Sequence, residues 1–207
     1  MFEYVDQTNY TYKVKDVNLA TEGRKLLTPD ADLAALRSEL EAQKPLAGRR
    51  ITCCQPVDAH GVAFVEALVA LGANVRVCAN STTSTVNELA AVLAADEVST
   101  FAWQGESLAE FWWCARKALD FADKATPDVI VDTDGRLSLL IAKGLEFTAN
   151  FDLYAADYSE ADEDTLELVE LLRMVRGHLD WNKLRAGLKS TFVQATADVV
   201  RQMASAK

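Results

Sequence analysis

Apolar and polar positions follow two alternating patterns between residue 50 and about residue 143. Short runs rich in β-branched residues predict strands, and longer segments with apolar residues at helical spacing predict helices. The predicted strands are residues 50–54, 74–78, 98–103 and 128–132. The predicted helices between them are residues 60–71, a helix capped by Ser84 or Thr85 that runs through residue 95, and residues 107–123. Strands joined by helical crossovers indicate an α/β fold, with a Rossmann-like or flavodoxin-like parallel sheet of about four to six strands flanked by helices.

Helical patterns also flank the predicted sheet. Residues 30–43 form an amphipathic pattern with Leu33, Leu36 and Leu40 on one face. Beyond the sheet, one helix capped by Asp162 or Asp164 ends near Gly177, and a second runs from about Asp180 towards Met203. We therefore expect a single α/β domain over residues 1–207. Its parts are an N-terminal arm and helix (1–48), a βα core (49–148) and a C-terminal helical extension (149–207).

Charge and hydropathy exclude several kinds of partner. Half of the 207 residues are apolar, which is enough for a sizeable core, and the net charge is −10. The 21 basic residues are scattered, so we expect no nucleic-acid partner. No run of eighteen apolar residues predicts a membrane span. The first nine residues contain two acids and no base, which argues against a secretory signal or a transit peptide.

Four cysteines lie within apolar runs and form no CxxC pair. They are Cys53, Cys54, Cys78 and Cys114. This pattern indicates buried, reduced thiols and no metal site. We therefore expect a reducing intracellular compartment, cytoplasmic by default, with the mitochondrial matrix or another organelle left open for a protein that belongs to a complex.

Polar residues follow the predicted strands where a parallel sheet places its functional loops. These loops are residues 55–60, 79–83, 104–107 and 133–135. A ligand crevice at this edge would be lined by Gln55, Asp58, Thr83, Asp134 and Glu160.

Five stretches stand out by their sequence. They are residues 12–24, 44–51, 65–75, 101–107 (Phe-Ala-Trp-Gln-Gly-Glu-Ser) and 110–114 (Glu-Phe-Trp-Trp-Cys). In this order and spacing they resemble the N-terminal, substrate-domain portion of the S-adenosylhomocysteine hydrolase family. The resemblance implies an α/β domain descended from an enzyme that binds adenosine and uses NAD.

The same resemblance implies that the catalytic positions are substituted. The family's first strand ends in a Cys-x-His-x-Thr loop, and here Pro56 and Asp58 occupy the positions of that His and Thr. The fourth strand ends in Asp-Asp-Gly-Gly-Asp with a catalytic second Asp, and here Thr133 occupies that position. Proline and threonine do not titrate near neutral pH, so we expect no catalytic residue. His60 is either a displaced base or a capping or surface residue.

The cofactor signals of the family are also missing from the sequence. No GxGxxG follows a strand, and no Lys-x-Lys-x-Asp motif is present. The family reaction begins with oxidation of the substrate by a bound nicotinamide. We therefore expect no cofactor, no NAD-binding domain and no hydrolase activity.

Three functional hypotheses follow. The first is a non-catalytic structural or accessory subunit of a larger protein assembly, with Trp112, Trp113 and Phe192 as its candidate interface. Adjacent tryptophans on a helix cannot face the same way, although such aromatic residues are more often core. The second is a module that binds adenosine or S-adenosylhomocysteine, and the third is an enzyme half-site completed by another chain. An unrelated flavodoxin-like fold stays possible.

Overall fold

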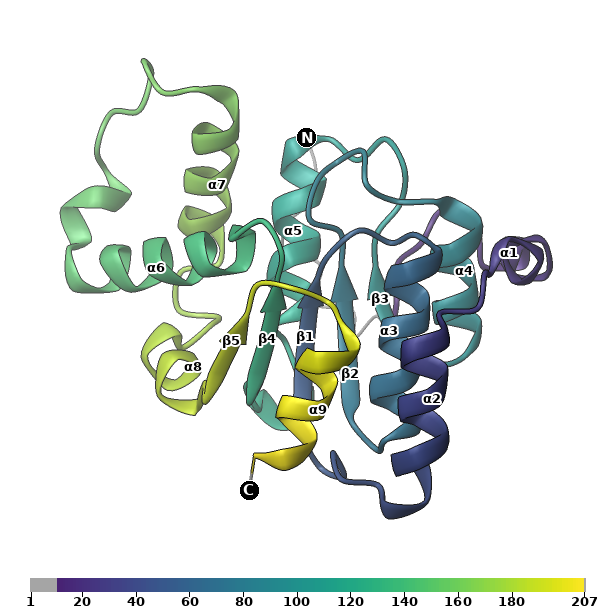
Figure 1. Cartoon of the computed structure of the whole chain (residues 1–207). Coiled ribbons are helices and arrows are strands. Elements are labelled where there is room, and N and C mark those ends of the chain that lie inside the picture. Colours follow the sequence, from purple (N-terminus) through teal and green to yellow (C-terminus); the bar gives the residue numbers. More distant parts are fainter. Residues whose placement is uncertain (1–10, 207) are drawn as a thin grey trace.

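The computed structural model describes residues 11–206, which form a five-stranded parallel sheet flanked by helices (Figure 1). The strand order is β3-β2-β1-β4-β5, and every neighbouring pair is parallel. The strands are β1 (Arg50–Cys54), β2 (Asn74–Cys78), β3 (Ser99–Phe101), β4 (Val129–Asp132) and β5 (Ser190–Phe192). The predicted fold class is therefore confirmed.

Two buried clusters lie on the two sides of the sheet. The first cluster contains Ile51 and Cys53 of β1 together with residues of α2 (Ala31–Leu40), α3 (Ala59–Ala70), α4 (Asn87–Ala95) and α9 (Ala197–Ser205). The second contains Cys54 together with residues of α5 (Leu108–Ala118), α6 (Arg136–Ala149), α7 (Glu163–Met174) and α8 (Trp181–Gly187). Because side chains alternate along a strand, successive residues of β1 serve opposite faces.

The remaining helical segments are short. α1 (Ala20–Leu26) packs on α4 so closely that a Cβ at Gly23 would overlap the Glu88 carbonyl. Four 3₁₀ turns complete the helical structure of the described residues: η1 (Val17–Leu19), η2 (Glu41–Gln43), η3 (Ala122–Lys124) and η4 (Phe151–Tyr154).

The two edges of the sheet differ. At the β3 edge, Lys13 forms a parallel bridge with Phe101, donating its amide to the Thr100 carbonyl and accepting from the Ala102 amide. At the other edge, β5 is the last strand among the described residues, and Val193 directly after it is 69% exposed. The N-terminal segment thus covers one edge.

The strand–helix boundaries agree with the sequence pattern at β1 and β2 but not at α4. Neither Ser84 nor Thr85 caps α4: the helix begins at Asn87, and its N-cap Val86 makes no side-chain capping bond. The Ser84 hydroxyl bonds the Ser81 backbone instead, and Thr85 forms a bridge with Val57. This local pairing extends the loop by two residues and delays the helix.

Two further helix predictions need correction or refinement. The helix expected over residues 107–123 ends at Ala118 and is followed by η3, where Asp123 and Lys124 have positive φ values of 57° and 54°. α7 is capped by Asp162, whose carboxylate accepts the Thr165 amide, and Asp164 is used elsewhere.

The single helix predicted from about Asp180 to Met203 is wrong. The segment forms α8, then β5, then α9. At the base of β4, the buried Asp128 carboxylate accepts hydrogen bonds from the Arg50 amide and guanidinium and pairs with Lys189. The Lys189 amide also donates to the Asp128 carbonyl, which places residues 190–192 beside β4 as a strand.

Candidate functional site

A crevice of about 520 Å³ opens where β2 and β4 end, on the side of the sheet that α5 and α7 cover. We call it the strand-end crevice. It is lined by Asn80, Ser81, Thr82, Leu108, Phe111, Asp134, Arg136 and Asp164. In register, Cys54 of β1 stands opposite both Cys78 and Asp132, so the two loops that follow β2 and β4 begin at the same level. A crevice at the carboxyl ends of the strands is where open α/β sheets bind ligands.

Asn80 is the central polar residue of the crevice. Its side chain is 7% exposed, and its Nδ2 donates to Thr133 Oγ1 at 3.0 Å and to Asp134 Oδ2 at 2.9 Å. Its Oδ1 is buried and has no hydrogen-bond partner. A buried acceptor without a donor costs free energy unless a ligand or water satisfies it, so Asn80 is prepared to accept a hydrogen bond.

Arg136 and Asp164 form a second part of the lining. Two guanidinium nitrogens of Arg136 contact the two carboxylate oxygens at 2.8 and 2.6 Å, which is bidentate geometry. The guanidinium also lies over the rings of Phe111 and Trp112, 5.0 and 4.4 Å from their centroids. Trp112 Nε1 donates to Asp164 Oδ1 at 2.9 Å. The two opposite charges compensate each other, and the ion pair and ring contacts together fix the position of both side chains.

Only one of the five predicted crevice residues lines this space. That residue is Asp134. Gln55 is buried and donates from Nε2 to the Gly61 carbonyl, and Asp58 caps α3 by accepting the Gly61 amide. Thr83 and Glu160 are exposed and lie outside the lining. Of the five residues, the structure therefore places only Asp134 in the lining of the strand-end crevice.

Sequence reasoning missed most of the lining. Asn80, Ser81 and Thr82 belong to a loop that the strand-end rule identifies, but the residue predicted from that loop is Thr83. Arg136 and Asp164 come from α6 and α7, 28 residues apart, and no local pattern indicates that they meet.

His60 lies away from the crevice. Its Nδ1 is 3.0 Å from Asp30 Oδ2 and its Nε2 is 2.6 Å from the Ala195 carbonyl oxygen. Both partners are acceptors, so both contacts are hydrogen bonds only when the ring is protonated. His60 thus bridges the starts of α2, α3 and α9. Of the two hypotheses for this residue, a displaced base or a capping or surface residue, the geometry matches the second.

The three residues expected at an interface are placed differently from one another. Trp112 and Trp113 are both buried, at 0% and 1% exposure, so the structure places neither candidate interface tryptophan at the surface of the described residues. Trp112 turns towards α7, and Trp113 packs edge-on against Phe101 of β3. Phe192 is half-buried in β5 and packs on the first core cluster.

The family model described as S-adenosyl-L-homocysteine hydrolase matches residues 11–207. The chain belongs to this family. A similar curated relative is the adenosylhomocysteinase of Solanum lycopersicum, 34% identical over 178 residues. The alignment covers 84% of the chain and 37% of that relative, so the chain spans little more than a third of the relative's length.

Within the S-adenosyl-L-homocysteine hydrolase family, the resemblance places a catalytic acid or base at the position of Thr133. Here the Thr133 hydroxyl accepts from Asn80 and donates to the Cys54 carbonyl at 3.3 Å. Pro56 lies half-buried in the loop after β1 and, like Asp58, does not line the strand-end crevice. The hydroxyl of Thr133 therefore joins two strand-end loops and holds Asn80 in place.

The turns after β1 and β4 do not fit the pyrophosphate of the dinucleotide that the family uses. Such a group needs a glycine-rich turn and free helix amides. The turn of residues 55–58 contains no glycine, and the Asp58 carboxylate already occupies the start of α3. At α6, the Asp132 carboxylate accepts the amides of Leu137 and Ser138. A phosphate at either helix would meet a carboxylate instead of free donors.

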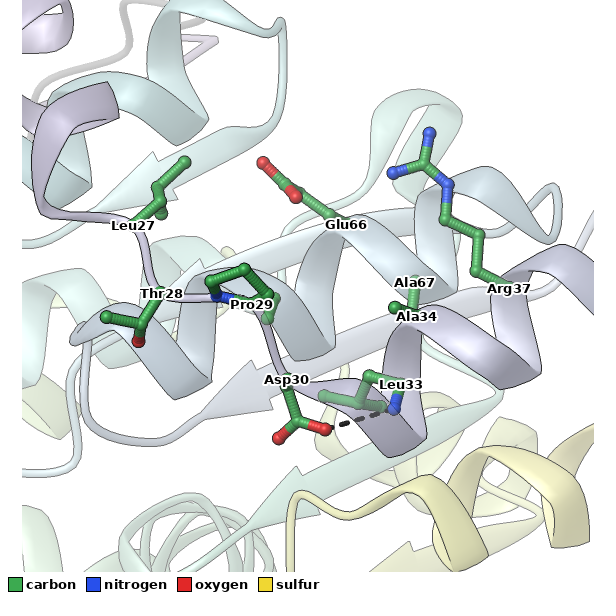
Figure 2. A pocket seen from close by; sticks show the side chains of 10 residues that line it. Leu27, Thr28, Pro29, Asp30, Leu33, Ala34, Arg37, Glu66 and Ala67 are labelled. Atoms are coloured by element: carbon green, nitrogen blue, oxygen red, sulfur yellow. Dashed lines mark hydrogen bonds between the residues drawn. The ribbon is translucent and has the colours of Figure 1, made fainter.

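A second hollow of about 220 Å³ lies between α2 and α3, apart from the crevice (Figure 2). Its walls are mostly apolar, and Glu66 and Arg37 project beside it from α3 and α2. Burial raises the pKa of Glu66. None of its lining residues lines the strand-end crevice.

Residues 11–206 also bear on the metal and membrane expectations. They contain no group of three or more His, Cys, Asp or Glu side chains placed to hold a metal ion. In the same range, helices long and apolar enough to cross a membrane are absent. The four cysteines are free and buried, and burial raises the pKa of the Cys53 and Cys114 thiols, which keeps them unreactive.

Proposed function

We propose that this chain is a non-catalytic member of the S-adenosyl-L-homocysteine hydrolase family that binds a small polar molecule in the strand-end crevice. Adenosine and S-adenosylhomocysteine are the first ligands to test, because the family acts on them. The observation that supports binding most directly is Asn80, a buried side chain with an unpartnered acceptor at the crevice.

The non-catalytic part of the proposal is supported by the state of Thr133. A threonine hydroxyl does not ionise near neutral pH, and here it is held between the Cys54 carbonyl and the Asn80 amide, so it cannot serve as a general acid or base. Asp134, the neighbouring carboxylate, is bonded by Asn80. The turns after β1 and β4 do not fit a dinucleotide pyrophosphate, which also supports the proposal.

Binding is tested by calorimetric titration of the chain with adenosine and with S-adenosylhomocysteine. We expect Asn80→Ala and Asn80→Ser to weaken binding by about tenfold or more, because each removes the amide carbonyl oxygen, and the shorter serine hydroxyl cannot take its position. The matched control is Thr83→Ala, an exposed neighbour outside the lining. Circular dichroism must show that all variants fold. Binding that survives both Asn80 changes would contradict the assignment of the crevice.

The absence of catalysis is tested separately, so that the two parts can fail independently. The chain is incubated with S-adenosylhomocysteine, with and without NAD, and the free thiol of the product is measured. We expect no turnover above the rate without protein. Turnover that is lost in Thr133→Val would overturn the non-catalytic proposal and leave the binding result untouched.

A second candidate is the accessory-subunit role, with other protein chains as partners. The edge of β5 favours it: Phe192 is half-buried there, Val193 is 69% exposed, and no described segment pairs with the outer side of the strand. An exposed strand edge can receive a strand from another chain. Native mass measurement of the chain isolated from its source tests this role, with Val193→Lys expected to release the partner. A reducing compartment is part of both proposals, because the four cysteines are free thiols.

A further inference from the structure

Arg76 lies in β2 with its guanidinium between two aromatic rings. The carbon of the guanidinium is 5.0 Å from the ring centroid of Phe101 and 5.5 Å from that of Phe121. Its Nη2 donates to the Lys117 carbonyl at 3.1 Å. Its Nε is buried and has no hydrogen-bond partner.

This environment is unusual for an arginine. Burial lowers the pKa of Arg76 to about 10, which means that the charged form is disfavoured. Among the described residues Arg76 forms no ion pair, and the nearby Asp120 is paired with Arg116 at 3.2 Å. A guanidinium group that is removed from water normally donates hydrogen bonds from Nε and Nη together to one carboxylate or phosphate group.

A hollow of about 480 Å³ lies against this side chain, and we call it the Arg76 hollow. It is lined by Thr11, Arg76, Ser99, Lys117, Asp120, Phe121, Ala122, Asp123 and Lys124. The lining contains three basic and two acidic residues, in a chain whose net charge is −10. It shares no residue with the strand-end crevice.

The outer wall of the hollow is a strained turn. Asp123 and Lys124 are successive non-glycine residues with φ of 57° and 54°, in the left-handed region that such residues rarely adopt. The Lys124 carbonyl is held by Lys183 Nζ at 2.8 Å. Strain of this kind persists only where the surrounding structure maintains it, and it concentrates at binding sites.

We propose that the Arg76 hollow binds a small oxyanion, a phosphate or carboxylate group, through the guanidinium of Arg76. The anion supplies the acceptor that Nε lacks, and it adds negative charge beside a guanidinium whose neighbouring carboxylate, Asp120, is already paired with Arg116. The two rings hold the guanidinium plane fixed, so little side-chain entropy is lost on binding. This site is independent of the function proposed for the crevice.

The test follows the Nε–H resonance of Arg76 in chain labelled with ¹⁵N at arginine. Inorganic phosphate and sodium acetate are titrated separately at constant ionic strength, with sodium chloride as the blank. We expect a saturable shift of the Arg76 signal with at least one oxyanion and none with chloride. The oxyanion with the lower Kd shows whether the site prefers a phosphate or a carboxylate group. Arg116 is an internal control, because its Nε is also buried and unpartnered but lies outside the hollow's lining. Equal shifts at both arginines, or no saturation, would overturn the proposal.

Two variants separate the site from general charge effects. Arg76→Gln should weaken oxyanion binding at least about tenfold, and Arg76→Lys should fall between it and the wild type, because it keeps the charge without the fork. Lys143→Gln, a surface change on α6, should leave binding unchanged. A further comparison uses the chain with and without residues 1–10, in the absence of added anion. If removal of these residues shifts the Arg76 Nε–H resonance, the acceptor belongs to the chain itself, and the proposal is overturned.

Discussion

The loops after β1 and β3 differ from those after β2 and β4 in how they use their polar groups. In the first pair, Asp58 caps α3, and one oxygen of Glu106 accepts the Trp103 amide at 2.7 Å. In the second pair, Asn80 has an unpartnered acceptor and lines an open crevice, whereas Gln55 and Glu106, which also have an unpartnered buried oxygen, lie outside that lining. Polar side chains at equivalent ends of one sheet therefore either stabilise the fold or remain available to a ligand, and composition alone does not distinguish the two.

The largest expected effect concerns Glu106, in the closed loop after β3. Burial raises the pKa of Glu106 to about 8, and its Oε2 has no partner. The folded chain therefore holds a proton that the unfolded chain releases near the ordinary value of 4.5. Stability is then greatest below the unfolded pKa and falls as the pH rises towards 8, by on the order of a few kcal/mol.

The measurement is the free energy of unfolding in urea at several pH values for the wild type and for Glu106→Gln. The glutamine keeps the size and the acceptor but cannot ionise. We expect a much flatter curve between pH 5 and 8 for the variant. Two parallel curves would show that Glu106 does not titrate in that interval.

The next effect concerns Arg136 in the crevice wall. Arg136→Met should destabilise the chain by about 2 kcal/mol, because Asp164 would keep its charge in a partly buried place without its bidentate partner. Crevice ligands should also bind more weakly. The double variant Arg136→Met, Asp164→Leu should recover part of the stability but not the binding. Chemical denaturation measures the free energy of unfolding, and calorimetry measures the ligand affinity. Full recovery of both quantities in the double variant would mean that the pair is only structural.

Asp58 tests the closed side of the comparison. Asp58→Ala removes the N-cap of α3 and should cost about 1 kcal/mol of unfolding free energy. Binding at the strand-end crevice should stay within error, because Asp58 does not line it. Asp58→Asn, which can still cap, is the matched control. A loss of ligand affinity in the alanine variant would remove the distinction between the closed and open loops.

The smallest effect concerns Asp30, which caps α2 and contacts His60. The hydrogen bond from the Leu33 amide, offset by some desolvation and assisted by His60, lowers the pKa of Asp30. A depressed carboxyl pKa gives stability above the unfolded pKa that is lost as the pH falls through the folded value. Asp30→Asn should therefore abolish a small acid-side decline in the melting temperature. A decline of unchanged size in the variant would assign it to other carboxylates.

The sheet could be predicted in detail where its strands are apolar. β1 and β2 have the predicted bounds because Arg50–Cys54 and Asn74–Cys78 alternate or run apolar between clear helical segments. β5 could not be predicted from the sequence, since Ser190–Phe192 is a three-residue strand with one apolar side chain. It forms beside β4, where Lys189 contacts Asp128. Tertiary pairing, not local pattern, decides such a strand.

The candidate site was predictable in location but not in membership. The strand-end rule located the loops of Asn80 and Asp134, because chain topology fixes which ends meet. It could not identify Asp164, which reaches the crevice from α7. Nor could it exclude Gln55, whose amide donates to the Gly61 carbonyl in the first turn of α3. Those outcomes depend on rotamers and on distant helices.

The Asp128 carboxylate has a consequence for how the strands find their alignment. It binds Arg50 from β1 and Lys189 before β5, which are 78 and 61 residues away in the chain. A slip of one residue in either pairing would reverse the faces of that strand and would also separate a buried charge from its partners. Both effects destabilise the misaligned arrangements. The Asp128 carboxylate therefore selects the native strand register during folding as well as stabilising the folded sheet.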